Sequence, residues 1–198
     1  MDPCRHLMFA PASVAWIDIA TDLGIPLIAK GGLGALTPAA IAKPAGCSRQ
    51  AVHQQLGSAE AMRRAVAARF LARWSRWVDV RAYLEGITGL LPDTEEVTDW
   101  VRVWLACCAY TATDTEVARW VADVHASERA VVRSALTRFN SSDNGPAQIP
   151  DGVTATLQAT VTGLRVARCH FGAPFEEVRS TLDATLGLVR QEDPPAVA

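Results

Sequence analysis

The sequence predicts an all-α fold, and three observations support this. Apolar residues recur three and four positions apart along most of the 198 residues, which is the spacing of one helix face. No segment keeps the strict apolar–polar alternation of a half-buried strand. Glycine, proline and helix-capping residues divide the chain into segments of helical length. Hydrophobic residues make up 49% of the chain and charged residues 20%, so a sizeable core is expected.

Two helices are expected first. An apolar helix runs from Val14 to about Lys30. Pro26 should bend or break this helix, because proline removes one backbone hydrogen bond and clashes with the preceding turn. Thr37 caps the next helix with Pro38 at its first position, where a missing N–H costs nothing, and Gly46 ends it.

Three further helices are expected before Pro92. Ser48 caps a third helix that extends to about Gln55, and Ser58 starts a fourth. A shorter helix is expected from Arg81 to Leu91, where proline follows. The fourth helix carries an apolar stripe whose members stand four positions apart: Met62, Val66, Phe70 and Trp74.

The rear of the chain predicts four further helices. They cover Glu95 to Thr111, Glu116 to Phe139, Val153 to Phe171 and Pro174 to Arg190. Residues 140–152, NSSDNGPAQIPDG, form a loop by composition. The last helix has one apolar face, made of Phe175, Val178, Leu182, Leu186 and Val189.

Charge is divided unevenly along the chain. Through Arg81 there are ten basic residues against five acidic ones, a balance of +5. The remainder carries nine arginines against sixteen acids, a balance of −7. If a polyanion binds, the front of the chain is therefore expected to meet it.

No catalytic or metal-binding motif is present. The sequence lacks HExxH, GxSxG and a phosphate loop ending in Gly-Lys-Ser/Thr, so we expect neither an enzyme nor a cofactor nor a metal site. The first residues, MDPCRHLMFAPAS, lack the pattern of a secretion signal, and no apolar run is long enough to span a membrane. A reducing cytoplasm is expected, since no CxxC pair occurs among Cys4, Cys47, Cys107, Cys108 and Cys169.

Residues 37–56, TPAAIAKPAGCSRQAVHQQL, have the layout of a helix-turn-helix. Val52 and Leu56 would face the core. In such units the second helix meets base edges; arginine matches the two acceptors of guanine, and glutamine matches adenine. A polar helix face that is merely solvated remains the alternative. The residues left facing outward are Arg49, Gln50, His53 and Gln54.

The order of residues in GLGALTPAAIAKPAGCSRQAVHQQLGSAEAM resembles the N-terminal domain of the tetracycline-repressor (TetR) family of transcriptional regulators. The resemblance implies a three-helix DNA-binding domain, a C-terminal domain that encloses a small-molecule pocket, and dimerisation through the last two helices. We accordingly expect a DNA-binding domain at residues 1–57, a connecting helix at 58–80 and a regulatory domain at 81–198.

The resemblance also assigns residues to DNA. It places Thr37 near a phosphate and brings Ser48, Arg49, Gln50 and Gln54 towards bases or backbone. Lys43 and His53 are expected to set general affinity.

Four positions depart from the family pattern. His53 replaces its usual backbone-contacting tyrosine, and Ala59 a lysine that approaches phosphate. Pro26 and Pro44 interrupt helices that the family keeps continuous. These departures leave open whether DNA binding is altered or lost.

An effector site is expected in the rear domain. An inward helix face with polar handles is typical of a ligand pocket, although large aromatics can also simply fill a core. The expected ligand is a small apolar or aromatic molecule. The candidate residues are Trp100, Trp104, Cys108, Tyr110, Trp120 and His125.

We therefore predict a homodimeric regulator that binds double-stranded operator DNA, most simply a repressor released by its effector. The alternative is a helical ligand-binding homodimer with weakened or lost DNA binding. In both cases Gly163 permits close approach of the partner, and Leu182 and Leu186 either join the contact or lie buried within one subunit. The expected dimer residues are Gly163, Phe175, Val178, Leu182, Leu186 and Val189.

Overall fold

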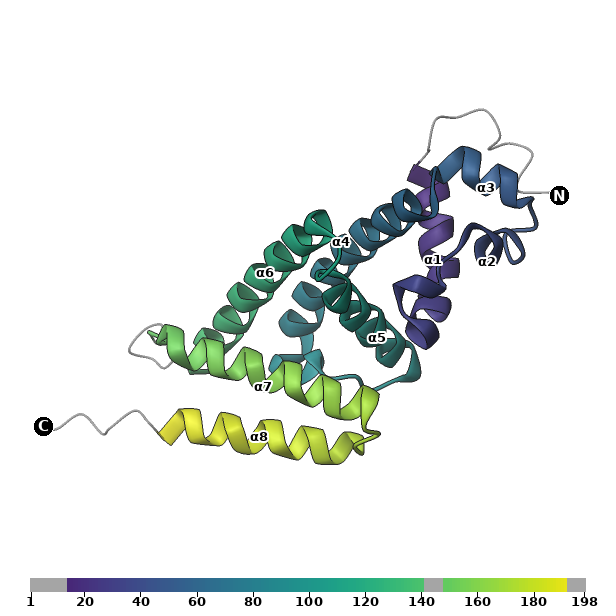
Figure 1. The fold of residues 1–198 in the computed structure, drawn as a ribbon. Helices are drawn as coiled ribbons and strands as arrows, with labels where there is room; N and C mark the ends of the chain where they lie inside the picture. The colour runs from purple at the N-terminus through teal and green to yellow at the C-terminus, as the bar shows by residue number, and fades with distance from the viewer. Residues whose placement is uncertain (1–13, 141–147, 192–198) are drawn as a thin grey trace, which may run out of the picture. The chain divides into compact units, whose positions relative to one another are not determined.

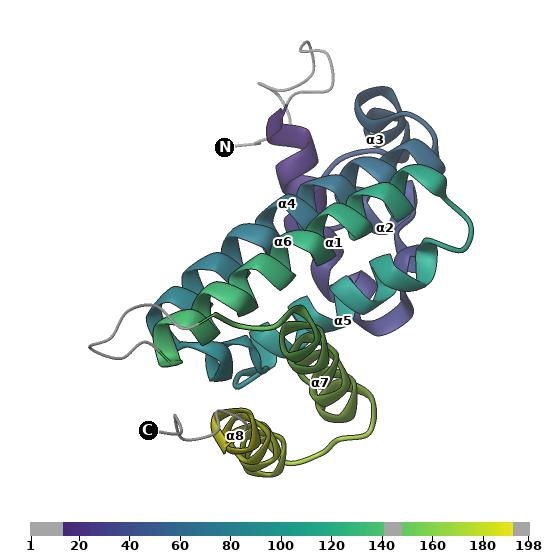
Figure 2. The same cartoon turned by 90° about the vertical axis from the view of Figure 1, so that its left-hand side faces the viewer.

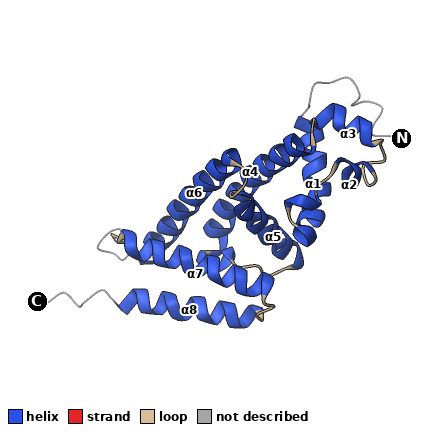
Figure 3. Ribbon diagram, in the orientation of Figure 1, coloured by secondary structure: helices blue, strands red, loops and turns tan. Residues whose placement is uncertain are grey.

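The computed structural model describes residues 14–140 and 148–191, and every regular element in these ranges is helical (Figures 1 and 3). The predicted all-α fold is confirmed. The elements are α1 (Val14–Gly31), the 3-10 turn η1 (Leu33–Ala35), α2 (Pro38–Ala42), α3 (Arg49–Leu56), α4 (Ala59–Glu85), the 3-10 turn η2 (Ile87–Leu90), α5 (Glu95–Tyr110), α6 (Thr115–Asn140), α7 (Asp151–His170) and α8 (Phe175–Gln191).

The chain divides into two compact units. Unit 1 comprises Met1–Trp74 and Asp99–Val124, and unit 2 comprises Ser75–Thr98 and His125–Ala198. Helices α4, α5 and α6 therefore contribute to both units. The division drawn from the sequence, at residues 57 and 80, concerned roles rather than compactness and stays a prediction.

Helix α1 continues through Pro26, so of the two predicted effects, a bend or a break, the break is wrong. Pro26 lies on the exposed side of the helix. The neighbouring Gly24 is buried, and a Cβ built on it would lie 3.0 Å from Leu36 Cδ1. The missing side chain at Gly24 thus allows Leu36 to pack closely on α1.

Local hydrogen bonds define the starts of α2 and α3 as predicted, whereas α2 ends at Ala42 and not at Gly46 as expected. Thr37 Oγ1 accepts the Ala40 N–H at 3.1 Å, and Ser48 Oγ accepts the Ala51 N–H at the same distance. Each hydroxyl satisfies a backbone donor that the helix start leaves unpaired.

The turn between α2 and α3 depends on Gly46, whose φ is +66°. The Cys47 N–H donates to the Ala42 carbonyl at 3.1 Å and the Gly46 N–H to the Lys43 carbonyl at 3.3 Å, the two bonds of a Schellman motif. Pro44 lies in this last turn and cannot donate. The turn around it remains hydrogen-bonded, and α2 ends at Ala42, two residues before Pro44.

The predicted stripe on α4 is confirmed: Met62, Val66, Phe70 and Trp74 are fully buried. In unit 1, Phe70 lies 5.7 Å from Trp100 of α5, and Trp74 stacks on Trp104 at the same centroid distance. Helix α4 is longer than predicted, and the separate helix expected from Arg81 to Leu91 is wrong. Residues 59–85 contain no glycine or proline, so the helix continues until Gly86, whose φ is +69°.

In unit 2, α7 and α8 lie side by side in both views (Figures 1 and 2). The four predicted rear helices begin and end within two residues of those observed. Arg165 of α7 is fully buried; its guanidinium donates to Glu128 Oε1 at 2.5 Å and to the Leu90 carbonyl at 2.9 Å. The middle of the predicted loop, residues 141–147, lies outside the described residues.

Candidate nucleic-acid interface

Helices α2 and α3 of unit 1 form the predicted helix-turn-helix, and the two faces of α3 separate as expected. Val52 and Leu56 are buried. The residues predicted to face outward are all exposed: Arg49, Gln50, His53 and Gln54. Because three of the four carry arginine or glutamine side chains, this face offers the donors and acceptors that match guanine and adenine.

Three further predicted DNA residues flank that face. Thr37 and Ser48 occupy the caps of α2 and α3, where each oxygen accepts a backbone N–H and each hydroxyl proton stays available for a phosphate. Lys43 is exposed at the C-terminal end of α2. Helix N-termini also attract anions through their unpaired N–H groups.

His53 is held by the turn that ends α3. Its Nδ1 lies 2.5 Å from the Gly57 carbonyl oxygen, and the Gly57 N–H donates to the His53 carbonyl at 2.8 Å. The ring is therefore oriented before any ligand arrives, with Nε2 as the remaining nitrogen.

Several arginines that made the front of the sequence basic are bonded to partners within unit 1. Arg69 donates to both carboxylate oxygens of Asp18, at 2.6 and 2.9 Å, and Arg73 pairs with Asp18 and Asp22. Arg63 donates to the Leu36 carbonyl. The balance of +5 already subtracts Asp18 and Asp22, so these pairs leave the sum unchanged but place these guanidiniums against groups of unit 1.

The sequence held a signal for this pairing. Asp18 and Asp22 stand four residues apart on α1, and Arg69 and Arg73 stand four apart on α4. Positions four apart share one helix face, so matching acidic and basic pairs predict two helices packed along those faces.

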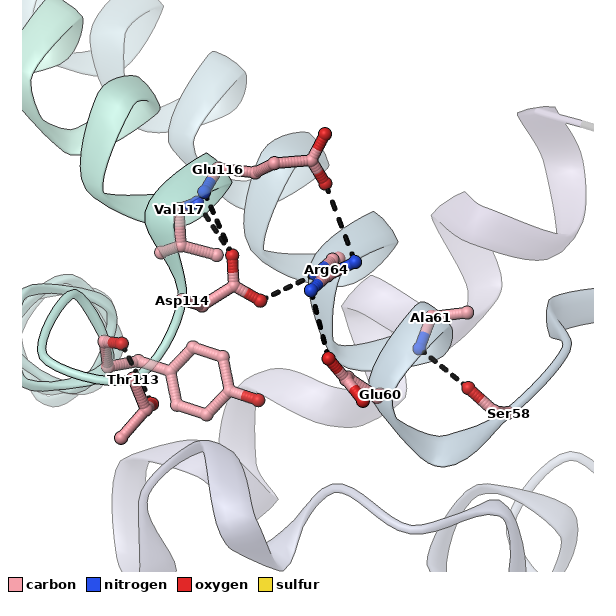
Figure 4. Close-up of polar contacts among 9 residues, drawn as sticks. Ser58, Glu60, Ala61, Arg64, Thr113, Asp114, Glu116 and Val117 are labelled. Atoms are coloured by element: carbon pink, nitrogen blue, oxygen red, sulfur yellow. Dashed lines mark hydrogen bonds and ion pairs between the residues drawn. The ribbon is translucent and has the colours of Figure 1, made fainter.

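Arg64 joins α4 to the start of α6 (Figure 4). Its Nε donates to Asp114 at 2.5 Å, and its two other nitrogens pair with Glu60 and Glu116. Asp114 also accepts the N–H groups of Glu116 and Val117, at 3.0 and 3.1 Å, and so caps α6. The hydrogen bond from Arg64, helped by these backbone donors, holds the pKa of Asp114 below its usual 3.8 despite opposition from burial.

Arg64 lies within two turns of Ser58, the cap of α4, which stands two residues after the end of α3. The sequence did not predict this contact, because a single arginine and a single aspartate fifty residues apart form no pattern.

The predicted effector residues are divided between packing and partial exposure. Trp104 is buried against Trp74, while five are half-buried: Trp100, Cys108, Tyr110, Trp120 and His125. His125 belongs to unit 2 and the others to unit 1. Burial raises the pKa of the neighbouring Cys107 thiol, so it is not a reactive thiolate.

Three cavities in the described structure lie elsewhere, in unit 2. One of them, an open groove of about 1000 Å³, runs between α4 and α6 past Tyr83 and Arg138. Another of about 350 Å³ is lined by Ile87, Phe139 and Leu186. None of the predicted effector residues lines these three, and their role stays a prediction.

The predicted dimer residues also differ in exposure. Val178, Leu182 and Leu186 are buried within the chain. Phe175 and Val189 are half-buried, whereas Gly163 is exposed and has open space beside it. The apolar face of α8 is therefore largely occupied inside one subunit.

Among the described residues no group of three His, Cys, Asp or Glu side chains is placed to hold a metal ion. Nor does the described part of the chain contain a helix long and apolar enough to cross a membrane. The four cysteines in the described ranges form no disulfide; Cys4 lies outside them.

The comparisons with known proteins agree with this architecture. A family model described as the C-terminal domain of a BetI-type transcriptional repressor matches residues 80–191, more than half of the chain. No curated protein matches the sequence significantly.

Three solved structures from Rhodococcus each align with 88% of this chain. One from Rhodococcus sp., described as a TetR-family transcriptional regulator, is 19% identical, has a TM-score of 0.70 and is covered over 98% of its length. A transcriptional regulator from Rhodococcus sp. Rha1 is 22% identical, with a TM-score of 0.68 and 96% of its chain covered. A third, from Rhodococcus sp. RHA1, is 18% identical with a TM-score of 0.60 and 97% covered. At these identities the likeness concerns the fold.

The Asp114 contact predicts how stability depends on pH. A carboxylate whose pKa is lower in the folded state stabilises the protein above its unfolded pKa, and this contribution is lost as pH falls through the lowered folded value. Asp114→Asn should therefore lower the urea midpoint at neutral pH, and its difference from the wild type should shrink below about pH 4. The exposed Asp123→Asn is the control. A difference that is constant down to about pH 2 would contradict the assignment.

Proposed function

Because the chain belongs to the TetR family of transcriptional regulators, we propose that it binds operator DNA through α2 and α3 and represses transcription until a small molecule releases it. The observation that carries the DNA-binding proposal is the outer face of α3. Arg49, Gln50 and Gln54 are exposed on a short helix whose start is capped and whose inner side is buried. Such a helix can enter a major groove without rearrangement.

Base reading and phosphate binding fall to different residues in this proposal. Arg49 and Gln50, in the first turn of α3, read bases, since the N-terminal part of the second helix meets the groove in such units. Thr37, Ser48 and Lys43 hold the phosphates beside it. Phosphate contacts fix the register, and base contacts select the sequence.

Members of this family dimerise, and we propose a dimer contact through α7 and α8 of unit 2. Since Leu182 and Leu186 are buried in their own subunit, the contact uses the remaining surface of both helices. Gly163 on α7 is exposed and would allow a partner helix to come close. Leu188 on α8 is 66% exposed and would supply apolar area.

One observation favours a second candidate, a ligand-binding dimer with weak DNA binding. In residues 14–56 the cations are Lys30, Lys43 and Arg49 only, and the next arginines along α4 are largely held in unit 1. Ala59 also lacks the charge that the family pattern has there. DNA affinity measured at several salt concentrations distinguishes the two candidates. Every phosphate that the protein neutralises steepens the slope of log K against log salt concentration by about 0.9.

The proposed setting is that of a transcription factor. We infer a cytoplasmic protein without enzymatic activity or cofactor, in keeping with its family. The effector would be a small apolar or aromatic molecule. It would act by binding the released conformation more tightly than the DNA-bound one, since a ligand with equal affinity for both shifts nothing.

Arg49→Ala tests base reading. The substitution should weaken binding to the operator by about 1–3 kcal/mol and relax the preference at one base pair, because a bidentate contact to guanine is lost. Binding to random DNA should change far less. The measurement is a titration of the operator and of a scrambled duplex at one salt concentration.

Arg76→Ala is the matched control, since Arg76 is also exposed but lies on α4 in unit 2. An equal loss on both duplexes would make Arg49 a phosphate contact. If the wild type bound neither duplex at low salt, the second candidate would be preferred.

Leu188→Glu tests the dimer contact. A charge on this exposed position should give a folded monomer, because an unpaired carboxylate would be buried in the contact. Leu84→Glu is the control: Leu84 is 69% exposed on α4, close to the 66% of Leu188. Light scattering reports the mass and circular dichroism the fold. A dimer that survives Leu188→Glu, or an equal loss in both variants, would reject the contact.

Effector binding should show reciprocity. A compound that lowers DNA affinity by some factor must itself bind the DNA complex more weakly by the same factor. Quenching of tryptophan fluorescence by apolar and aromatic compounds, with and without operator, measures both. Trp120→Phe and Trp100→Phe then locate the site, since both rings are half-buried. The mechanism would be excluded by a compound that releases DNA but binds the protein with the same affinity in the presence and absence of DNA.

A further inference from the structure

His53 is anchored at one ring nitrogen. Nδ1 lies 2.5 Å from the Gly57 carbonyl oxygen. A carbonyl only accepts, so the proton of the neutral ring must sit on Nδ1. The Gly57 N–H donates back to the His53 carbonyl, and the φ of +76° at Gly57 directs the chain into α4. The same turn that ends α3 therefore selects the tautomer of the imidazole.

This anchoring decides what the outer nitrogen can do. With the proton on Nδ1, Nε2 of the neutral ring is an acceptor and cannot bond to a phosphate, whose oxygens also accept. Once protonated, the ring keeps its bond to Gly57 and gains an Nε2–H donor with a positive charge. The last turn of a helix favours such a charge, because the unpaired carbonyls there are negative.

Within the described part of the chain, none of the carboxylates around α3 is paired with His53. On α3 itself Arg49 lies one turn earlier, and α2 ends at Lys43. On α1, Asp18 and Asp22 are held by arginines of α4, and Lys30 is exposed; at the start of α4, Glu60 is held by Arg64. Among the described residues His53 takes part in no ion pair.

We propose that His53 is a protonation-gated DNA contact: its neutral ring offers DNA only an acceptor, and its imidazolium donates Nε2–H to a phosphate oxygen. The proposal rests on the proposed DNA-binding function and adds to it a dependence on pH. An imidazole changes its protonation between about pH 5 and 8. Affinity for DNA of any sequence should therefore rise as pH falls through this range.

The test is DNA affinity at about pH 8 and about pH 5.5, at several salt concentrations. The wild type should bind at least about fivefold more tightly at the lower pH. Its log–log salt slope should also steepen there by about 0.9 per His53 engaged. His53→Gln should bind at both pH values with little difference between them, because its amide does not titrate. His170→Gln, which removes an exposed histidine of unit 2, should keep the wild-type pH response.

Three results would overturn the gate: wild-type binding that is independent of pH, an unchanged pH response in His53→Gln, or a response lost in His170→Gln instead. Absence of DNA binding at every pH would overturn the proposed function and the gate together. A readout without DNA separates these cases. Nitrogen chemical shifts of His53 in the free protein should show the proton on Nδ1 at high pH, and a dominant Nε2–H form would reject the anchoring on which the gate depends.

Discussion

The burial of the α4 stripe is the interaction on which unit 1 depends. Met62, Val66, Phe70 and Trp74 are fully buried, and each such side chain contributes about 1.5–3 kcal/mol relative to an exposed one. The stripe meets the tryptophans of α5, and Val66 lies near the position of Gly24 in α1. Ion pairs then line its flanks. Since α3 is joined to α4 by a single turn at Gly57, the position of α3 depends on this packing.

Patterns that act within one helix were readable from the sequence. The caps at Thr37 and Ser48, the turn at Gly46, the α4 stripe and the inner and outer faces of α3 all follow from rules that span a few residues. The errors in helix bounds have different origins. Pro26 was expected to bend or break α1, and its position on the exposed side of that helix was not readable from the sequence. The separate helix expected from Arg81 was an avoidable error, because residues 59–85 contain no glycine or proline.

The candidate site was predictable as a set of residues but not as a charge distribution. A sum of charges along the sequence cannot tell that Arg64 and Arg73 point to carboxylates rather than outward. The same limit applies to α8, where an apolar stripe fits a neighbour in the same subunit as well as one in another. Only the packing of Leu182 in the interior of one chain separates those cases. The orientation of His53 depends on a turn carbonyl, which has no signature in the sequence.

The pairing of arginines with Asp18, Asp22 and Asp114 has a consequence for non-specific DNA binding in a whole genome. A regulator must find few operators among millions of competing non-specific sites, and its hold on those sites comes almost entirely from unpaired cations. Under the proposed function, carboxylates that occupy these guanidiniums would weaken non-specific binding and leave recognition to the outer face of α3. A smaller fraction of the protein molecules would then be bound at non-specific sites, so a modest number of molecules could keep an operator occupied.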